Sequence, residues 1–441
     1  MRLLVGNDWN AEVRPDRRRG ADWRAQRIVW FAEEGDVVVI PGTPDDSFLE
    51  YATELTGVGR ASINVVICSG EDLELVGAIA GAEAVTASTF LNTLRDQIGG
   101  HWIERVFAIW PGVEVATLAH ALGIESKLPG ARFMSQDGGR LVNSKAIFRA
   151  LASGAGVPIP TGRVCSSRMA LADALRAVLS SRRPIAVKQE YGAAGQGNEI
   201  LTMDETLRPI GGKLVVIGQM LTTDEYVETR WEAISSQGKS RVVVEDYYPN
   251  SRAFFAEFDL SEDDVTLAGT GEMLSSPFAD GEIMPAQGID ESTLKSIISG
   301  GERLSRTVHA IGYRGRLSAD AIITTNNDVF FTEYNGRITG STHIYDVIGK
   351  RVVGAGYGHD RIILERVWLR RGLFTRSFSS TIERLRAANL AYDLKSRIGV
   401  ILTNAFDPRY CGVPYCIIAP DLNAAQAIDH DLERAFKIAS A

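Results

Sequence analysis

The residues best suited to chemistry lie on two neighbouring apolar runs near residue 330. Asp320 belongs to the first run, and Glu333, Asn335 and Arg337 belong to the second, with a turn signal at residues 326–328 between them. This pattern predicts a β-hairpin. Strand alternation places Glu333, Asn335 and Arg337 on one face, where Asp320 can meet Glu333. Two facing carboxylates repel unless a cation neutralises them, and Mg²⁺ takes such oxygen ligands together with nucleotide phosphates. The hairpin therefore predicts a magnesium site.

A plainer interpretation of the hairpin is an exposed strand face with an ordinary Glu–Arg cross-strand pair. The neighbouring residues Ile322, Ile323, Phe330 and Phe331 instead favour a mostly buried hairpin. Alternation places Phe331 on the same face as Glu333. Because buried acids need partners, the burial favours the metal site.

A second segment combines a lysine with a glycine-rich loop. Lys188 ends the predicted strand 184–188, and Gly192, Gly195 and Gly197 follow it. A lysine at a strand end is a point charge for phosphate oxygens, and glycines let backbone N–H groups approach them. The segment is not a Walker A motif, because Gly-Lys-Ser/Thr is absent. The alternative is a solvated lysine before an ordinary hairpin.

A third segment is an apolar strand that runs into acids and aromatics at Glu245, Asp246 and Tyr247. Such a strand can lay its backbone polar groups along an adenine edge, with an aromatic side chain against the ring. An ordinary strand end is the competing interpretation.

The elements that must position these residues follow from periodicity. Short β-branched runs at 2–6, 36–40, 63–68 and 105–110 alternate with helical patterns, which predicts a doubly wound α/β unit. The first strand is not followed by Gly-x-Gly-x-x-Gly, so no dinucleotide site is expected there.

The remainder of the chain predicts α+β units. Residues 145–154 form a helix capped by Asn or Ser, and strands dominate from 212 to 333 around a helix at 291–311. The tail from 354 is expected to be helical until the apolar run 399–402. We divide the chain at these changes into residues 1–140, 141–220, 221–353 and 354–441.

The bulk composition suits a multidomain globular enzyme. The 441 residues are 45% hydrophobic and 23% charged, and the net charge of −8 offers no global attraction to nucleic acid. The four cysteines include no Cys-x-x-Cys pair, and no stretch is long and apolar enough for a membrane span or a secretory leader. We expect a cytoplasmic protein without nucleic-acid or membrane partners, and a homodimer as the commonest assembly.

Together and in this order, these segments resemble the ATP-grasp superfamily over residues 143–345. The resemblance rests on Ser144–Lys145 with the turn at 156–160, Lys188 with its loop, residues 244–247, and the hairpin from Asp320 to Arg337. It implies an ATP-grasp fold that binds ATP and Mg²⁺. The implied roles are phosphate binding by Lys145 and Lys188, a lid at Gly192–Gly197, adenine binding by Glu245 and the backbone of Asp246 and Tyr247, metal ligation by Asp320, Glu333 and Asn335, and an acyl phosphate facing Arg337.

Two positions depart from the superfamily pattern. Arg252 stands where many members have a ribose-binding acid, and Ser318 stands where D-alanine–D-alanine ligase-like members have arginine. Ribose recognition and oxyanion stabilisation are therefore open.

More narrowly, the opening residues 3–10, the phrase at 312–320 and the tail at 410–416 are similar to the peptide ligases of pheganomycin biosynthesis in Streptomyces. This resemblance implies a Rossmann-like pre-ATP-grasp domain, an ATP-grasp pair and a small C-terminal domain. It also implies an antibiotic-pathway ligase that joins an amino-acid-like, guanidino-phenylglycine-type acid to the α-amine of a peptide. The alternatives are a ligase of free amino acids or dipeptides, and a non-catalytic nucleotide-binding protein.

Substrate-contacting residues are less well marked in the sequence. His309 lies in a helical pattern and suits a structural role, whereas His343 follows Gly340-Ser-Thr and suits a substrate pocket. For a cationic acid substrate, the acids considered are Asp8, Glu257, Glu272 and Asp346, without a ranking.

Overall fold

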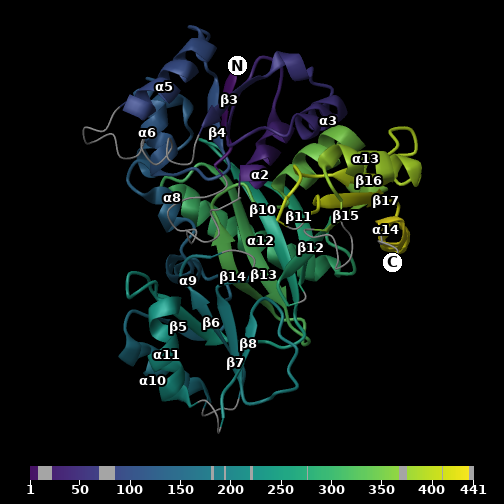
Figure 1. Ribbon diagram of the computed structural model, residues 1–441. Coiled ribbons are helices and arrows are strands. Elements are labelled where there is room, and N and C mark those ends of the chain that lie inside the picture. Colours follow the sequence, from purple (N-terminus) through teal and green to yellow (C-terminus); the bar gives the residue numbers. More distant parts are fainter. Residues whose placement is uncertain are drawn as a thin grey trace.

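The computed structural model describes residues 1–7, 22–68, 85–179, 183–192, 195–218, 222–275, 277–366, 375–409 and 411–436. These residues form three β-sheets with helices packed against them (Figure 1). No helix within these ranges is long and apolar enough to cross a bilayer.

The N-terminal sheet is parallel and has the strand order β3-β2-β1-β4. Every residue of its β2 strand is buried, as expected for a sheet covered on both faces. The predicted α/β arrangement is thus confirmed. Its strands are β1 (Arg2–Val5), β2 (Val37–Pro41), β3 (Asn64–Cys68) and β4 (Arg105–Ala108); its helices are α2 (Asp22–Ala25), η1 (Gln26–Phe31), α3 (Asp46–Thr56), η2 (Arg60–Ser62), α5 (Val85–Ile98), α6 (Val113–Ala121), η3 (Glu125–Lys127), α7 (Ala131–Met134) and α8 (Gly138–Leu141).

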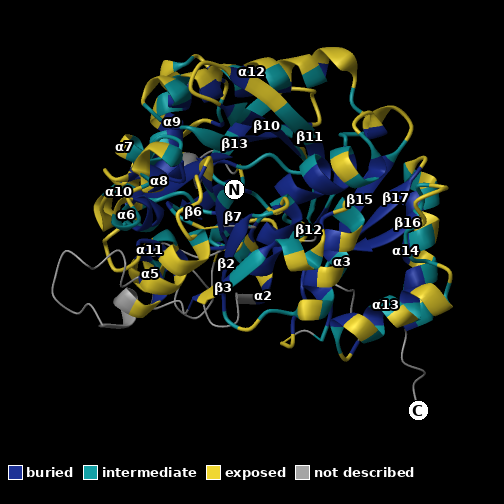
Figure 2. Cartoon of the chain, turned by 90° about the horizontal axis from the view of Figure 1, so that it is seen from above, coloured by how far each residue is buried: buried dark blue, intermediate teal, exposed yellow. Residues whose placement is uncertain are grey.

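The central sheet has eight strands in the order β14-β13-β10-β11-β12-β15-β17-β16, all antiparallel. Helix α12 (Glu291–Ala310) covers one face, and a Cβ at Gly300 would lie 2.5 Å from the Phe331 ring. Figure 2 shows the exposed side of α12 on the outside of the molecule. The strands are β10 (Arg252–Leu260), β11 (Val265–Ser275), β12 (Ala279–Met284), β13 (Gly315–Ile323), β14 (Val329–Asn335), β15 (Ile362–Arg366), β16 (Gly399–Leu402) and β17 (Tyr415–Ala419).

The third sheet is small and has the order β5-β9-β6-β7-β8. Tyr226 and Trp231 of α11 and Leu175 of α10 are among its buried core residues. Figure 1 shows this unit at the end of the molecule away from the N-terminal sheet. Its elements are β5 (Gly162–Cys165), α10 (Arg168–Leu179), β6 (Ile185–Gln189), β7 (Asn198–Thr202), β8 (Lys213–Val216), α11 (Thr223–Ile234) and β9 (Val242–Asp246), and α9 (Lys145–Gly154) precedes it.

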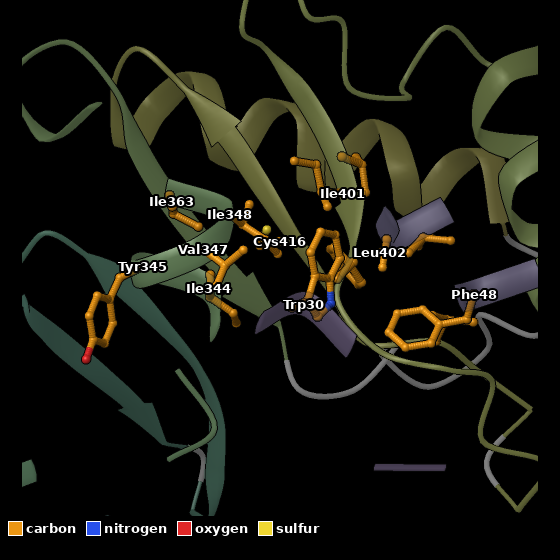
Figure 3. Close-up of a cluster of buried hydrophobic side chains, with 14 of the residues drawn as sticks. Trp30, Phe48, Ile344, Tyr345, Val347, Ile348, Ile363, Ile401, Leu402 and Cys416 are labelled. Atoms are coloured by element: carbon orange, nitrogen blue, oxygen red, sulfur yellow. The ribbon is translucent and has the colours of Figure 1, made fainter. Parts of the chain in front are cut away.

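The two ends of the chain share one hydrophobic core. Trp30 of η1 lies beside Ile401, Leu402 and Cys416 (Figure 3). Its ring N–H donates to the Thr403 carbonyl oxygen at 2.9 Å. The N-terminal segment therefore packs on the strands that extend the central sheet. The remaining elements are the π-helix η4 (Ile344–Val353), η5 (Tyr357–His359), α13 (Phe378–Ala387) and α14 (Leu422–Phe436).

Two local predictions are wrong. Residues 362–366 form strand β15 rather than helix, because this short apolar run completes the sheet between β12 and β17. In the hairpin, Asp320 pairs with Glu333 but Ala321 pairs with Phe331, so a bulge leaves Thr332 unpaired. The bulge turns Phe331 to the α12 face, opposite Glu333.

The division of the chain into four units remains a proposal. Strand β9 belongs to the small sheet, and β15 to β17 extend the central sheet.

Candidate active site

The hairpin of β13 and β14 brings the predicted metal ligands together. Asp320 and Glu333 are directly paired, and Ser318 pairs with Asn335. The Ser318 hydroxyl donates to Asp320 Oδ1 at 2.8 Å, and Asn335 Nδ2 donates to Oδ2 at 3.0 Å. Burial and then the Glu333 carboxylate raise the pKa of Asp320 to about 8. Asp320 and Glu333 are thus held together in a buried site, where the negative charge of Asp320 is unfavourable unless a cation neutralises it.

Glu333 is neutralised by a lysine from a different element. Lys145 begins α9, and its Nζ lies 2.8 Å from Glu333 Oε2. Burial acts to raise the pKa of Glu333, but Lys145 and then Lys188 outweigh it, so the pKa is lowered. The α9 start is fixed by Ser144, whose hydroxyl accepts from the Ile147 N–H at 3.1 Å.

The oxygen donors fit a magnesium ion. Asn335 uses its amide N–H₂ on Asp320, which leaves its carbonyl oxygen available beside the two carboxylates. In the described part of the chain, no three Asp, Glu, His or Cys side chains converge as a metal site. The donor set is therefore two carboxylates and one amide oxygen, a hard set that Mg²⁺ accepts with phosphates.

Lys188 of β6 reaches the same hairpin and lies in a buried ionic network. Its Nζ is 2.5 Å from Glu245 Oε1 and 3.5 Å from the Thr332 carbonyl oxygen. Arg149 Nη1 contacts Glu245 Oε2 at 2.6 Å. The structure thus brings Lys145 and Lys188 to the same hairpin, one on Glu333 and one beside Thr332.

In the predicted adenine-binding segment, the backbone N–H groups already donate hydrogen bonds within the protein. The Asp246 N–H donates to the Thr161 carbonyl oxygen at 2.8 Å, and the Tyr247 N–H donates to that of Pro184 at 3.0 Å. The Glu245 carboxylate forms ion pairs with Lys188 and Arg149. Any contact of this segment with a nucleotide therefore has to come from carbonyl groups or side chains.

The glycine loop joins β6 to β7, and its residues 193 and 194 lie outside the described ranges. Gly195 has φ +72°, and a Cβ there would lie 2.7 Å from the Gly211 carbonyl oxygen, so this position requires glycine. The Gly192 carbonyl oxygen accepts from Lys145 Nζ at 3.1 Å, and that of Gly197 accepts from the Gln189 N–H at 3.1 Å.

Arg337 follows β14 and is held by two residues from before α9. Its Nη1 donates to Asn143 Oδ1, and its guanidinium lies 4.1 Å from the Trp110 ring centroid. Asn7 fixes the Trp110 backbone through hydrogen bonds of 2.7 and 3.1 Å. The predicted catalytic arginine is therefore held by Asn143, just before α9, and by Trp110 of the N-terminal unit.

A small cavity of about 70 Å³, partly open to solvent, adjoins Arg337. Its walls come from β4 and the start of β13, and they include Arg105, Arg314 and Arg316 with a single acid, Asp259. This lining favours an anionic group. The sequence did not reveal Arg105 or Arg314, because the cavity forms only when the N-terminal and central sheets meet.

The acids considered for a cationic substrate have different surroundings. Glu257 is fully buried and accepts from the hydroxyls of Thr339 and Thr342 at 3.0 and 2.8 Å, and burial raises its pKa. Glu272 is paired with Arg252 at 2.7 Å, and Asp346 is paired with Arg316 and Lys350. Asp8 lies outside the described residues.

The two histidines lie in different surroundings. His309 is half-buried on α12, where its Nε2 lies 3.0 Å from the Ser261 carbonyl oxygen. His343 is buried, and its Nε2 lies 3.2 Å from the Thr403 carbonyl oxygen.

Comparisons with known proteins agree with this architecture. A family model described as the pre ATP-grasp domain matches residues 25–124, and one described as the PGM1 C-terminal domain matches residues 381–432. The "[Butirosin acyl-carrier protein]--L-glutamate ligase" of Niallia circulans is 21% identical over 332 residues. That alignment covers 73% of this chain and 66% of the relative, so the chain spans slightly under two thirds of the relative's length.

Solved structures are similar over nearly the full chain. The N5-carboxyaminoimidazole ribonucleotide synthetase purK in its ADP complex is 13% identical with a TM-score of 0.59, covering 98% of this chain and 95% of that one. An L-amino acid ligase from Bacillus licheniformis is 13% identical with a TM-score of 0.56, covering 100% and 98%. A biotin carboxylase–β-γ-ATP complex from Campylobacter jejuni is 15% identical with a TM-score of 0.56, covering 96% and 89%. At these identities the likeness concerns the fold, and the chain has the expected ATP-grasp fold preceded by a pre-ATP-grasp domain.

Proposed function

We propose that this chain is an ATP-dependent carboxylate–amine ligase that works through an acyl phosphate and releases ADP. The observation that carries the proposal is the hairpin of Asp320, Glu333 and Asn335 with Lys145 and Lys188 against it. These groups combine metal-binding oxygens with buried cations, as transfer of a phosphoryl group requires. The similarity to an L-amino acid ligase and to an acyl-carrier protein–glutamate ligase supports the same reaction class.

The reaction balances without a covalent enzyme intermediate. A carboxylate oxygen of the acid attacks the γ-phosphorus of ATP, the bond to the β–γ bridging oxygen breaks, and ADP leaves. The amine nitrogen of the second substrate attacks the acyl carbon. The tetrahedral adduct then loses phosphate, and the amine proton passes to phosphate or solvent. The products are an amide, ADP and phosphate.

The side chains have separate roles in this scheme. Mg²⁺ held by Asp320, Glu333 and Asn335 would offset charge on the nucleotide phosphates. Lys145 and Lys188 would exchange their present carboxylate partners for phosphate oxygens. Arg337 would stabilise the oxyanion of the tetrahedral adduct, since Ser318 lacks the charge for this role. The loop from Gly192 to Gly197 would exclude water, which hydrolyses acyl phosphates.

For the substrates, we propose an amino-acid-like acid and the α-amine of a peptide, in a peptide antibiotic pathway. The motifs at residues 3–10, 312–320 and 410–416 support this choice, and the C-terminal family match at 381–432 is compatible with it. Action in the cytoplasm and a homodimeric state belong to the same proposal.

A ligase of free amino acids is the second candidate, because the L-amino acid ligase similarity covers the full chain. ADP release measured across single amino acids and longer peptides separates the two. Turnover with peptides as amine acceptors is expected. Efficient turnover of free amino acids alone would replace the peptide substrate, and no ADP release with any acid and amine pool would favour a non-catalytic nucleotide-binding protein.

A further inference from the structure

Arginines from two parts of the chain meet at the cavity beside Arg337. Arg105 begins β4, the edge strand of the N-terminal sheet, whereas Arg314 and Arg316 lie at the start of β13 in the central sheet. Among the described residues of this lining, Asp259 is the single acid. Four guanidinium groups that face one small cavity repel one another, and a bound anion would offset that repulsion.

The arginines do not form salt bridges between the two sheets. The ion pairs of Arg314 and Arg316 run to three acids from the part of the chain that builds the central sheet: Glu262, Asp259 and Asp346. Arg105 is exposed and forms no ion pair with a described residue. A cluster that only held the sheets together would pair arginines of one sheet with acids of the other. The cluster therefore has a role other than joining the sheets.

Arg316 has a donor that the protein does not use. Its Nη2 donates to Asp346 Oδ2 at 2.7 Å, and its Nε lies 3.9 Å from Asp259 Oδ1. Its Nη1 is shielded from solvent and has no hydrogen-bond partner in the described part of the chain. Leaving a buried guanidinium N–H without an acceptor is unfavourable. An anionic group in the cavity that Arg316 lines would supply this acceptor.

The size and position of the cavity separate it from the nucleotide site. A volume of 70 Å³ admits roughly five water-sized groups at ~10–15 Å³ each, which suits a carboxylate or a phosphate group but not a nucleotide or a whole peptide. Arg316 shares one face of β13 with Ser318 and Asp320, because alternate residues of a strand lie on the same face. It is four residues from Asp320, or about 14 Å at ~3.4 Å per residue. A phosphate at the metal ligands therefore does not fill this cavity.

We infer that Arg105, Arg316 and Arg337 form a subsite for a second anionic group of a substrate, a carboxylate or a phosphate distinct from the carboxylate that is activated. Arg337 lines the cavity and faces the reacting carbon in the proposed reaction, so the second anionic group lies close to the bond that forms. An acidic side chain on a single amino acid places an anion at such a distance. The inference rests on the proposed function only for the role of the anion's carrier as a substrate.

Calorimetric titration of the full-length protein with saturating Mg-ADP tests the subsite without turnover, because ADP occupies the nucleotide site. The probes are L-glutamate against L-glutamine, O-phospho-L-serine against L-serine, and L-alanine against L-alaninamide. The members of each pair differ in one anionic group. We expect the anionic member of at least one pair to bind about tenfold more tightly, the gain expected from charge-assisted hydrogen bonds to a guanidinium. The pair that responds identifies the group as a side-chain carboxylate, a phosphate or an α-carboxylate.

Substitution of the exposed Arg105 locates the bound anion. Arg105→Gln should weaken binding of the anionic probe by about threefold to tenfold, and Arg105→Lys should restore part of the affinity. The matched control Arg163→Gln, on the exposed strand β5, should leave the affinity unchanged. A wild type that binds the members of every pair equally or binds none of them, or equal effects of the two Gln variants, would overturn the inference.

The outcome for the subsite can be separated from the outcome for the ligase. Selective anion binding without ADP release from any acid and amine pool would keep the subsite and refute the ligase. ADP release at equal rates with the anionic and neutral members of every pair, without selective binding, would do the reverse.

Discussion

The Asp320→Asn variant should be more stable than the wild-type protein when no ligand is bound. The pKa of Asp320 is raised from 3.8 to about 8 by burial and by Glu333. A pKa shift of one unit corresponds to about 1.4 kcal/mol, so above pH 8 the charged Asp320 carboxylate lowers the free energy of unfolding by about 6 kcal/mol. The variant removes this charge but also leaves Asn335 Nδ2 without its acceptor, which costs about 1–3 kcal/mol. The net stabilisation at pH 8.5 is then about 3–5 kcal/mol.

The sign of the pH dependence follows from the raised pKa. An acid whose pKa is raised in the folded state contributes its stability fully below pH 3.8 and loses it as the pH rises to about 8. The stability difference between variant and wild type should therefore increase by about 3 kcal/mol between pH 5.5 and 8.5. Other buried acids, such as Glu257 and Glu365, are present in both proteins and cancel to first order.

Urea unfolding at pH 5.5, 7 and 8.5 measures this difference. Asp263→Asn is the control, because Asp263 is an exposed acid in the turn between β10 and β11. With Mg-ATP and substrates, Asp320→Asn should lose at least 100-fold in turnover, since one metal ligand has lost its charge. A stability difference that does not change with pH, or a variant that is less stable at pH 8.5, would refute the assigned charge repulsion.

Three further changes test individual roles by steady-state kinetics. Lys188→Met should raise the KM for ATP by at least tenfold through loss of a phosphate contact, and an unchanged KM would remove Lys188 from the nucleotide site. Arg337→Lys should lower kcat by about 100-fold, or about 2.7 kcal/mol, with little change in the KM for ATP. The reason is that lysine cannot donate the two parallel hydrogen bonds of a guanidinium to the oxyanion. A change confined to the KM for ATP would contradict this role. Arg105→Ala should raise the KM for the anionic substrate about threefold to tenfold, because Arg105 lines the cavity beside Arg337. The control Arg163→Ala, on the exposed strand β5, should leave this KM unchanged. Equal effects of the two variants would exclude the arginine-lined cavity as a substrate site.

The hairpin could be predicted because its signals are local. Alternation, the turn at 326–328 and the apolar neighbours together predict that Asp320 meets Glu333, and the register agrees. The bulge at Thr332 has no such signal, since one extra residue in a strand leaves the composition unchanged. Strand alternation alone therefore predicts the wrong face for Phe331.

Contacts between distant segments could not be predicted from the residues alone. Glu333 meets Lys145 across 188 positions of sequence, and Glu282 meets Glu365 only because β12 and β15 are neighbours in the sheet. The sequence does not predict strand β15, because a run of five residues is too short for periodicity to separate strand from helix. Register between non-local strands depends on the whole packed sheet.

In the proposed reaction the carboxylate passes through an acyl phosphate. The direct measurement uses an acid substrate labelled with ¹⁸O in its carboxyl group and mass spectrometry of the released phosphate. If an acyl phosphate forms, the phosphate should carry one ¹⁸O atom for each amide formed, together with ADP, and Glu333→Ala should transfer no label. Unlabelled phosphate, or label found in AMP, would contradict it.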